Sequence, residues 1–335
     1  MRQALRPTPL ARRPQVEAIV NDQLAAGIIE PSRSPYAVNL VLVAKHDGSL
    51  RACCDYRSLN AATKRDAYPL PRMEQCLDAL GGNNKVFSTL DLRSGYHQVA
   101  MDPRDKEKTS FICHMGSFCF RTMPMGLVNA GATFQRLMDI VMSGLLYDKC
   151  LVYLDDIIVF SPDYDTQLDN LEAVLRRLME YGLKLKASKC KLFQKRVSFL
   201  GHVISADGVE TDPEKTKAID EWATPTNVSE VRSFLGICGY YRRFIKDYAE
   251  VSFPLSNLLR KSVRFKWTAE CQQAFETLKA ALTTSPILAM PRATGRFILD
   301  TDASDHALGG ALSQEQEDEN GRVVERVIAY GSRVL

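Results

Sequence analysis

The sequence has no run of about 18 apolar residues, so we expect no membrane-spanning helix and no membrane partner. Its nine cysteines include no CxxC pair, and only Cys53 and Cys54 are adjacent. This pattern argues against a zinc module or a disulfide framework and favours reduced thiols. The five histidines show no metal-ligand spacing, and we interpret Cys113-His114 with Cys119 as core filling. With 45% hydrophobic and 25% charged residues, the composition excludes a disordered or collagen-like chain.

Acidic residues are absent from the first 16 positions, which contain four arginines. Such a segment is typical either of a mitochondrial targeting sequence or of a basic, extended linker. Pro7, Pro9 and Pro14 oppose the amphipathic helix that targeting requires, which favours the linker. No apolar segment typical of a secretory signal is present.

The net charge of the chain is small, but the charged residues are unevenly distributed along it. The 335 residues carry 43 basic and 40 acidic side chains, a net charge of +3. Residues 176–196 hold eight basic residues and one acid, and residues 242–266 hold seven and two, whereas residues 300–335 hold three and eight. A single basic run is explained by a helix face exposed to solvent. Two such runs in one chain favour a basic surface that contacts the phosphate backbone of a nucleic acid. The length suggests about two domains.

Hydrophobic periodicity predicts a helix over residues 15–29 that closes at Gly27. A strand over 37–44 is expected to turn at Asp47-Gly48 into a second strand over 51–56, because Asp-Gly between apolar runs is typical of a hairpin. The remaining expected elements are strands over 86–92, 151–154, 157–160, 197–204 and 296–301, helices over 133–146 and 168–178, a mainly helical region over 213–285, and a segment over 311–313 introduced by Gly309-Gly310. The order indicates an α+β protein rather than repeated βαβ units.

The most informative local feature is the pair Asp155-Asp156 between two short apolar β runs. Adjacent acids at the tip of a buried hairpin repel each other and lose hydration unless a cation neutralises them. The alternative is an exposed turn, although tight turns favour Asn-Gly or Asp-Gly. Asp91 ends another apolar run, where a helix cap or turn residue is the alternative interpretation. Aspartates that meet on adjacent strands form an oxygen-only site suited to Mg²⁺ and to two-metal phosphoryl transfer.

Several segments carry a specific resemblance. Tyr153-Leu154-Asp155-Asp156, together with LDLRSGYHQ (90–98) and FRTMPMGL (120–127), resembles the reverse transcriptase of gypsy-type LTR retrotransposons. Further segments resemble the same family and occur in the same order as in that family, at residues 26–37, 47–60, 199–209, 231–245 and 299–314. The resemblance implies an α+β right-hand polymerase fold with fingers, palm and thumb, followed by the start of a ribonuclease H-like α/β domain. The implied domains are a basic linker and entry helix (1–30), fingers and palm (31–210), thumb and helical connection (211–290), and a truncated ribonuclease H-like start (291–335).

The resemblance also implies roles for individual residues at the polymerase site. Asp91, Asp155 and Asp156 correspond to the catalytic, metal-binding triad, which implies two Mg²⁺ ions, with Mn²⁺ as an alternative. Tyr96 corresponds to the residue that packs under the incoming sugar and excludes a 2′-hydroxyl, whereas a core tyrosine is the alternative from its sequence context alone. The other implied nucleotide contacts are Lys45, Arg51, Met125 and Gly126.

Further implied roles concern the template and primer. Gln135, expected at the start of a helix, corresponds to a residue that helps to orient the template. The implied primer grip is the hairpin Phe199, Leu200, Gly201 and His202. Arg242 and Arg243 are expected to contact the duplex, and snorkelling arginines on a helix packing face are the alternative. Asp302 corresponds to the first ribonuclease H carboxylate. The other acids of that site are expected beyond Leu335, so we expect no ribonuclease H activity from this chain.

These implications predict an RNA-directed DNA polymerase that extends a primer on an RNA or DNA template with dNTPs. The expected setting is an element polyprotein, with its other products as partners, in cytoplasmic virus-like particles with later nuclear access. One alternative is a decayed or domesticated copy that binds nucleic acid without catalysis, against which the intact triad argues. The other is a DNA-templated Mg²⁺ polymerase, against which the fingers, primer-grip and Asp302 segments argue.

Overall fold

The computed structural model describes residues 2–44, 50–318 and 320–335. The chain forms two compact units, and each is described separately. The first contains Met1–Pro71, Leu90–Ile157 and Glu172–Cys190, and the second contains Arg72–Thr89, Ile158–Leu171 and Lys191–Leu335. Both mix helices and sheets, which confirms the predicted α+β class. Among the described helices, none combines the length and hydropathy needed to cross a membrane.

A five-stranded sheet organises the beginning of the first unit. Its strands are β1 (Ile29–Pro31), β2 (Val38–Ala44), β3 (Leu50–Cys54), β5 (Phe111–Cys113) and β6 (Gly116–Phe120), in the order β1-β6-β5-β2-β3. The predicted pairing of β2 with β3 is confirmed, because the two are antiparallel with Val43 opposite Arg51. The predicted turn at Asp47-Gly48 lies outside the described residues.

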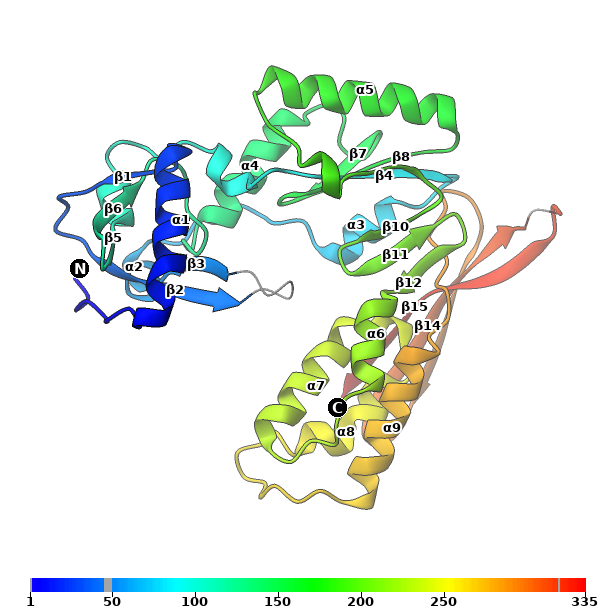
Figure 1. The fold of residues 1–335 in the computed structure, drawn as a ribbon. Coiled ribbons are helices and arrows are strands. Elements are labelled where there is room, and N and C mark those ends of the chain that lie inside the picture. Colours follow the sequence, from blue (N-terminus) through cyan, green and yellow to red (C-terminus); the bar gives the residue numbers. More distant parts are fainter. Residues whose placement is uncertain (1, 45–49, 319) are drawn as a thin grey trace. The chain divides into compact units, whose positions relative to one another are not determined.

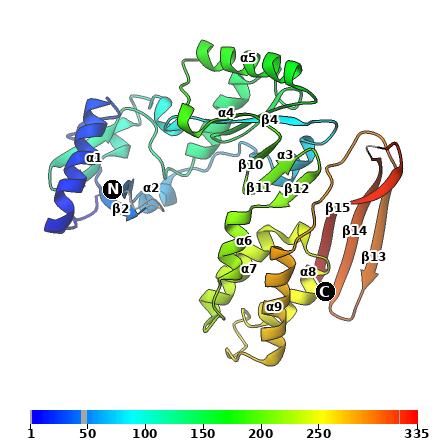
Figure 2. The ribbon, with the colours of Figure 1, turned by 45° about the vertical axis from the view of Figure 1, so that its right-hand side comes forward.

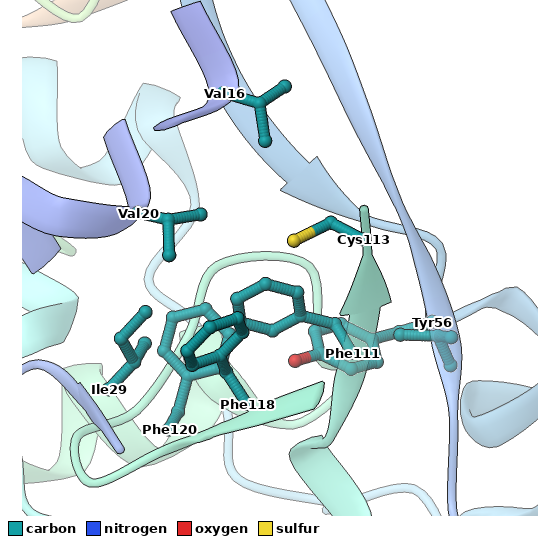
Figure 3. Packing of buried hydrophobic residues seen from close by; sticks show 9 residues of the cluster. Val16, Val20, Ile29, Tyr56, Phe111, Cys113, Phe118 and Phe120 are labelled. Carbon is teal, nitrogen blue, oxygen red and sulfur yellow. The ribbon is translucent and has the colours of Figure 1, made fainter. Parts of the chain in front are cut away.

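Helix α1 (Arg13–Ala25) supplies one side of the core of this sheet (Figure 1). Its buried Val16 and Val20 point toward the apolar side chains of the strands (Figure 3). Tyr56 is buried in the same cluster and satisfies its hydroxyl by donating to the carbonyl of Thr109 at 2.8 Å. The other buried members are Ile29, Val38, Phe111, Cys113, Phe118 and Phe120. The helix predicted over 15–29 is present with different bounds, since α1 ends at Ala25 and Ile29 belongs to β1. Cys113 lies in a hydrophobic core.

A second sheet contains the strands beside which Asp91, Asp155 and Asp156 lie. It consists of β7 (Cys150–Tyr153), β8 (Asp156–Ser161), β4 (Val86–Asp91) and β9 (Lys191–Gln194), in the order β7-β8-β4-β9. Helices α4 (Ala130–Val141) and α5 (Tyr164–Glu180) lie beside this sheet (Figure 1). Two shorter helices, α2 (Arg57–Ala62) and α3 (Met73–Ala79), precede β4 in the sequence. One prediction needs correction. Asp156 does not belong to the turn, because β8 begins at that residue and the turn consists of Leu154 and Asp155.

The second unit contains a three-stranded antiparallel meander of β10 (Arg196–Phe199), β11 (His202–Ser205) and β12 (Gly208–Thr211). The single strand predicted over 197–204 is therefore wrong. Leu200 and Gly201 have φ angles of +46° and +65° and form a two-residue turn. A turn with two positive φ angles matches the twist of antiparallel strands and usually has Asn, Asp or Gly in its first position. Leucine occupies that position here, so the sequence gives no local signal of a turn.

The predicted helical region of the second unit is confirmed as α6 (Pro213–Asp220), α7 (Val228–Tyr240), α8 (Tyr248–Asn257) and α9 (Ala269–Thr283). Asp212, Asn227 and Thr268 accept backbone N–H groups as N-caps of α6, α7 and α9. The chain then forms β13 (Phe297–Ala303), β14 (Ala307–Glu317) and β15 (Val323–Val334), which lie side by side as one antiparallel sheet (Figure 2). Gly309-Gly310 lies inside β14 rather than before it.

Candidate active site

A cavity of about 620 Å³ in the first unit brings distant parts of the sequence together. Asp91, at the end of β4, and Asp155, in the β7–β8 turn, both line it. Arg51 of β3 and Met125 line it as well. Four residues that the sequence assigned to a polymerase site therefore face one space. Lys45, a fifth, lies outside the described residues.

The carboxylates of this site influence one another. Partial desolvation raises the pKa of Asp156, and the nearby charges of Asp155 and Asp91 raise it further, while Lys189 opposes them. Asp156 nevertheless keeps an exposed surface. Three mutually repelling carboxylates, with oxygen as the only donor atom, fit the preferences of Mg²⁺ and Mn²⁺. In the described ranges, however, no three His, Cys, Asp or Glu side chains form a cluster that could hold a metal ion, so the three aspartates do not converge into a preformed metal site.

Lys189 is a site residue that the sequence reasoning missed. Its Nζ lies 3.1 Å from Oδ2 of Asp91, and it lines the same cavity together with Lys186. The backbone positions this segment, because the N–H of Lys186 donates to the carbonyl of Asp91 at 2.8 Å. The sequence placed both lysines in a basic run that follows nucleic acid. Their approach to Asp91 depends on pairing between segments almost 100 residues apart, for which the sequence gives no local signal.

The turn that carries Asp155 is held from α4. Leu154 has a φ angle of +55°, which is unfavourable for a residue with a β-carbon. Its N–H donates to Oε1 of Gln135 at 2.7 Å, and Nε2 of Gln135 donates to the carbonyl of Val152 at 3.3 Å. Gln135 is 1% exposed and lies inside α4, which begins at Ala130. The predicted helix start is therefore wrong, and this side chain faces the turn that carries Asp155 rather than solvent.

Gly95 allows close packing beside Asp155. A β-carbon at this position would lie 3.1 Å from Cζ of Phe134 and 3.5 Å from Cβ of Asp155. Tyr96, the next residue, packs its ring against Phe134 with the ring centroids 5.1 Å apart. Burial raises the pKa of Tyr96, and the charge of Asp155 adds to the effect. The predicted sugar-contacting tyrosine therefore lies near the turn that carries Asp155.

We predict that Gly95→Ala lowers the turnover number of the polymerase reaction about 10-fold or more, because a misplacement of well below 1 Å near reacting groups is costly. The added methyl group has to displace the ring of Phe134 by a few tenths of an ångström, and it fills the space beside Asp155 at ordinary contact distance. Gly236→Ala is the matched control, since a β-carbon at Gly236 meets nothing within 4 Å. Steady-state primer extension measures the effect. Equal turnover by both variants would contradict the requirement for glycine at position 95.

The loop that carries Met125 and Gly126 is fixed by Asn60. Its Nδ2 donates to the carbonyl of Gly126 at 2.8 Å, and its Oδ1 accepts the N–H of Val128 at 2.8 Å. Gly126 has a φ angle of +93°, which glycine adopts without strain. The predicted need for glycine here thus has a conformational basis. Asn60 lies in the matching segment 47–60, but the sequence gives no local signal that it holds this loop.

The predicted primer-grip hairpin lies in the second unit, where two tyrosines hold its turn. The hydroxyl of Tyr240 donates to the carbonyl of Leu200 at 2.6 Å, and that of Tyr241 donates to the carbonyl of Gly201 at 2.7 Å. His202 is 3% exposed and donates from Nδ1 to the carbonyl of Leu200 at 2.7 Å, since a carbonyl can only accept. Its Nε2 makes no hydrogen bond to any described residue. The turn is thus preorganised by three side chains.

Burial lowers the pKa of His202 to about 4, from an ordinary value of 6.5. The native state keeps this ring neutral, whereas the unfolded chain takes up a proton below pH 6.5. Its contribution to stability is therefore complete above about pH 6.5 and is lost as pH falls toward 4. The free energy of unfolding falls by up to about 3 kcal/mol over this range because of His202. We predict that His202→Gln flattens the fall in unfolding free energy over this range, as measured by urea titration. The exposed His306→Gln should leave the fall unchanged, and parallel curves for wild type and His202→Gln would contradict the prediction.

The remaining predicted residues occupy different settings. Arg243 is 8% exposed, and its Nη2 lies 3.0 Å from Oδ1 of Asp78 and 3.3 Å from the carbonyl of Ile328. This geometry favours the structural alternative for Arg243. Arg242 and Arg243 both line a separate cavity with Glu74 and Tyr330. Asp302 is exposed on β13, and its Oδ1 accepts the N–H of Ala303.

Comparisons with known proteins agree with this arrangement. Residues 43–204 match the family described as reverse transcriptase (RNA-dependent DNA polymerase). Residues 267–335 match the RNase H-like domain found in reverse transcriptase. The chain is 42% identical to the retrovirus-related Pol polyprotein from transposon opus of Drosophila melanogaster, over 98% of this chain and 34% of that protein. It is 38% identical to the corresponding polyprotein from transposon gypsy of the same organism, over 88% of this chain and 30% of that protein.

Solved structures show the same fold. A foamy viral protease-reverse transcriptase in complex with double-stranded DNA superimposes with a TM-score of 0.86 at 23% identity, covering 100% of this chain and 57% of that one. The same type of protein in complex with an RNA/DNA hybrid gives a TM-score of 0.84, covering 99% and 44%. These likenesses confirm the predicted polymerase fold with the start of an RNase H-like domain. The chain spans about a third of the length of the curated relatives it matches.

Proposed function

Because this chain belongs to the reverse transcriptase family of LTR-retrotransposon Pol polyproteins, we propose that it catalyses RNA-directed DNA synthesis. Its substrates are a primer on an RNA or DNA template and the four dNTPs. The observation that carries the proposal is the cavity in which Asp91 and Asp155 face Arg51 and Met125. The proposal assigns the fingers and palm to residues 31–210, the thumb and connection to 211–290, and the ribonuclease H-like start to 291–335.

Each residue of the cavity has a role that its chemistry supports. Arg51 presents a guanidinium fork, which suits the oxygens of a triphosphate. Lys186 and Lys189 add positive charge beside Asp91, which favours an anionic substrate. Lys45 provides a further phosphate contact in the proposal. Met125 and Gly126 pack beside the nucleotide, and Tyr96 contacts its sugar.

Reverse transcriptases generally depend on divalent metal ions, and we propose two Mg²⁺ ions held by Asp91, Asp155 and Asp156, with Mn²⁺ as a substitute. When bound, the ions activate the attacking 3′-oxygen and stabilise the pyrophosphate that leaves. The chain itself supplies the negative charge that attracts the ions. It also supplies the rigid turn at Leu154, which fixes Asp155 before any substrate arrives.

The nucleic-acid partner is proposed to contact the second unit as well. The turn at Leu200-Gly201 suits a primer grip because its backbone is already fixed by Tyr240 and Tyr241. The foamy viral relatives bind double-stranded DNA and an RNA/DNA hybrid, which supports a duplex ligand for this chain. The polyprotein relatives support other element products as partners, and we propose cytoplasmic virus-like particles with later nuclear access as the setting.

Primer extension tests this function directly. The wild-type chain is incubated with poly(rA) annealed to oligo(dT), with dTTP and Mg²⁺, and products are resolved by length. We expect template-dependent extension that stops when EDTA is added and resumes when excess Mg²⁺ is restored. Binding of the primer-template without extension would instead favour a copy that binds nucleic acid but does not catalyse.

A further inference from the structure

From outside the active-site cavity, a chain of hydrogen bonds reaches the turn that carries Asp155. It begins where Gln135 holds Leu154 of that turn and Val152 of the preceding strand β7. The same Nε2 of Gln135 also donates to Oδ1 of Asp139 at 2.9 Å, one helical turn further along α4. The second oxygen of Asp139 accepts the hydroxyl of Tyr68. Tyr68, Asp139, Gln135 and the turn therefore form one connected set, which we call the turn support.

The turn support fixes which way the Gln135 amide faces. Leu154 N–H needs an acceptor, and the carbonyl of Val152 needs a donor, so only one orientation of the amide satisfies both. Asp139 is an acceptor toward Gln135 and would oppose the flipped amide. Its negative charge also makes this hydrogen bond stronger than a neutral one. Asp139 thus selects the orientation that holds the turn.

Tyr68 is itself held in place by its neighbours. The guanidinium carbon of Arg136 lies 4.5 Å from the centre of its ring, and Arg136 pairs with both oxygens of Asp66 at 2.7 and 2.9 Å. The backbone N–H of Tyr68 donates to Asp66 at 2.9 Å. The hydrogen bond to Asp139 raises the pKa of Tyr68, so its hydroxyl remains a donor at neutral pH. The hydroxyl therefore presents one fixed donor to Asp139.

The turn needs such support. A leucine at φ +55° lies in the left-handed region, which is unfavourable for a residue with a β-carbon. The hydrogen bond from Leu154 to Gln135 offsets part of this conformational cost. Since Asp155 follows Leu154 directly, a change in the φ of Leu154 would redirect the carboxylate that lines the cavity.

We propose that Tyr68 and Asp139 are positioning residues of the polymerase reaction, which act through Gln135 on the turn that presents Asp155. The inference rests on the proposed function for its kinetic consequence. Neither residue is among those that line the cavity. Both act on the orientation of a carboxylate rather than on substrate affinity.

The test compares Tyr68→Phe, which removes only the hydroxyl, with Tyr147→Phe at an exposed tyrosine of the same unit. Hydrogen–deuterium exchange of the Leu154 amide is followed by NMR on the full chain. We expect Tyr68→Phe to speed exchange of this amide about 10-fold and Tyr147→Phe to leave it unchanged. This readout requires no enzymatic activity, so it decides the structural claim even if the wild-type chain fails to extend a primer. Unchanged exchange at Leu154 in Tyr68→Phe overturns the proposal.

The kinetic arm measures single-nucleotide incorporation. Tyr68→Phe is expected to lower kcat about 3- to 10-fold with a less than twofold change in KM for dTTP, because positioning rather than binding is impaired. In a Gln135→Met background, Tyr68→Phe should cause no further loss, since the link to the turn is already broken. The proposed route through Gln135 is overturned if the kcat losses of the two single variants multiply in the double variant. It is also overturned if Tyr68→Phe changes only KM.

Discussion

Replacement of Asp155 by alanine is expected to lower primer extension about 1,000-fold or more. Asp155 lines the cavity beside Asp91, and its charge contributes to the raised pKa of Asp156. Removing it takes away one of the three carboxylates proposed to hold the divalent ions, whose stabilisation of the transition state is worth several kcal/mol. Extension of oligo(dT) on poly(rA) with dTTP and Mg²⁺ measures the effect.

The same substitution should leave folding intact, which separates a catalytic loss from a structural one. Asp155 is partly exposed, and the turn is held by the backbone of Leu154 rather than by the Asp155 carboxylate. Asp148→Ala is the matched control, because Asp148 is an exposed acid of the same unit. Asp155→Ala should bind the primer-template and melt much like Asp148→Ala. Equal extension by the two variants would remove Asp155 from the proposed mechanism.

The sequence predicted those parts of the site that are carried by contiguous segments. Asp91 and Asp155 follow apolar β runs, and such runs pair into one buried sheet, so their approach could be expected. The hairpin of β2 and β3, which carries Arg51, was likewise predicted from two apolar runs around Asp47-Gly48. In each case the signal is local, because hydrophobic alternation specifies both the strand and the face that it buries.

The contacts that complete the site were not predictable in the same way. Lys189 and Asp91 meet only because separate segments pair, and Tyr68 reaches Asp139 from a segment 71 residues away. Leu154 and Leu200 adopt positive φ angles, which leucine does not favour by itself. Tertiary hydrogen bonds from Gln135 and Tyr240 accompany these two conformations. The sequence therefore indicated the residues that are proposed to carry the chemistry, but not the residues that hold them in place.

Replacement of Tyr96 by valine is expected to raise the ratio of ribonucleotide to deoxyribonucleotide incorporation about 10-fold or more. The Tyr96 ring packs against Phe134 beside the turn that carries Asp155. In the proposed complex this ring lies under the sugar, where it leaves no room for a 2′-hydroxyl. Valine removes the ring and opens that space, and a steric barrier of a few kcal/mol corresponds to selectivity of this size.

Tyr96→Phe is the matched control, because it keeps the ring and its packing on Phe134 while removing only the hydroxyl. It should retain the sugar selectivity of the wild type. Incorporation of UTP and dTTP opposite the same template adenine, measured as kcat/KM for each, gives the ratio directly. If Tyr96→Val loses activity with both nucleotides in equal proportion, the ring supports the fold of the site through Phe134 and does not select the sugar. That outcome would make Tyr96 the core tyrosine that its sequence context alone indicates.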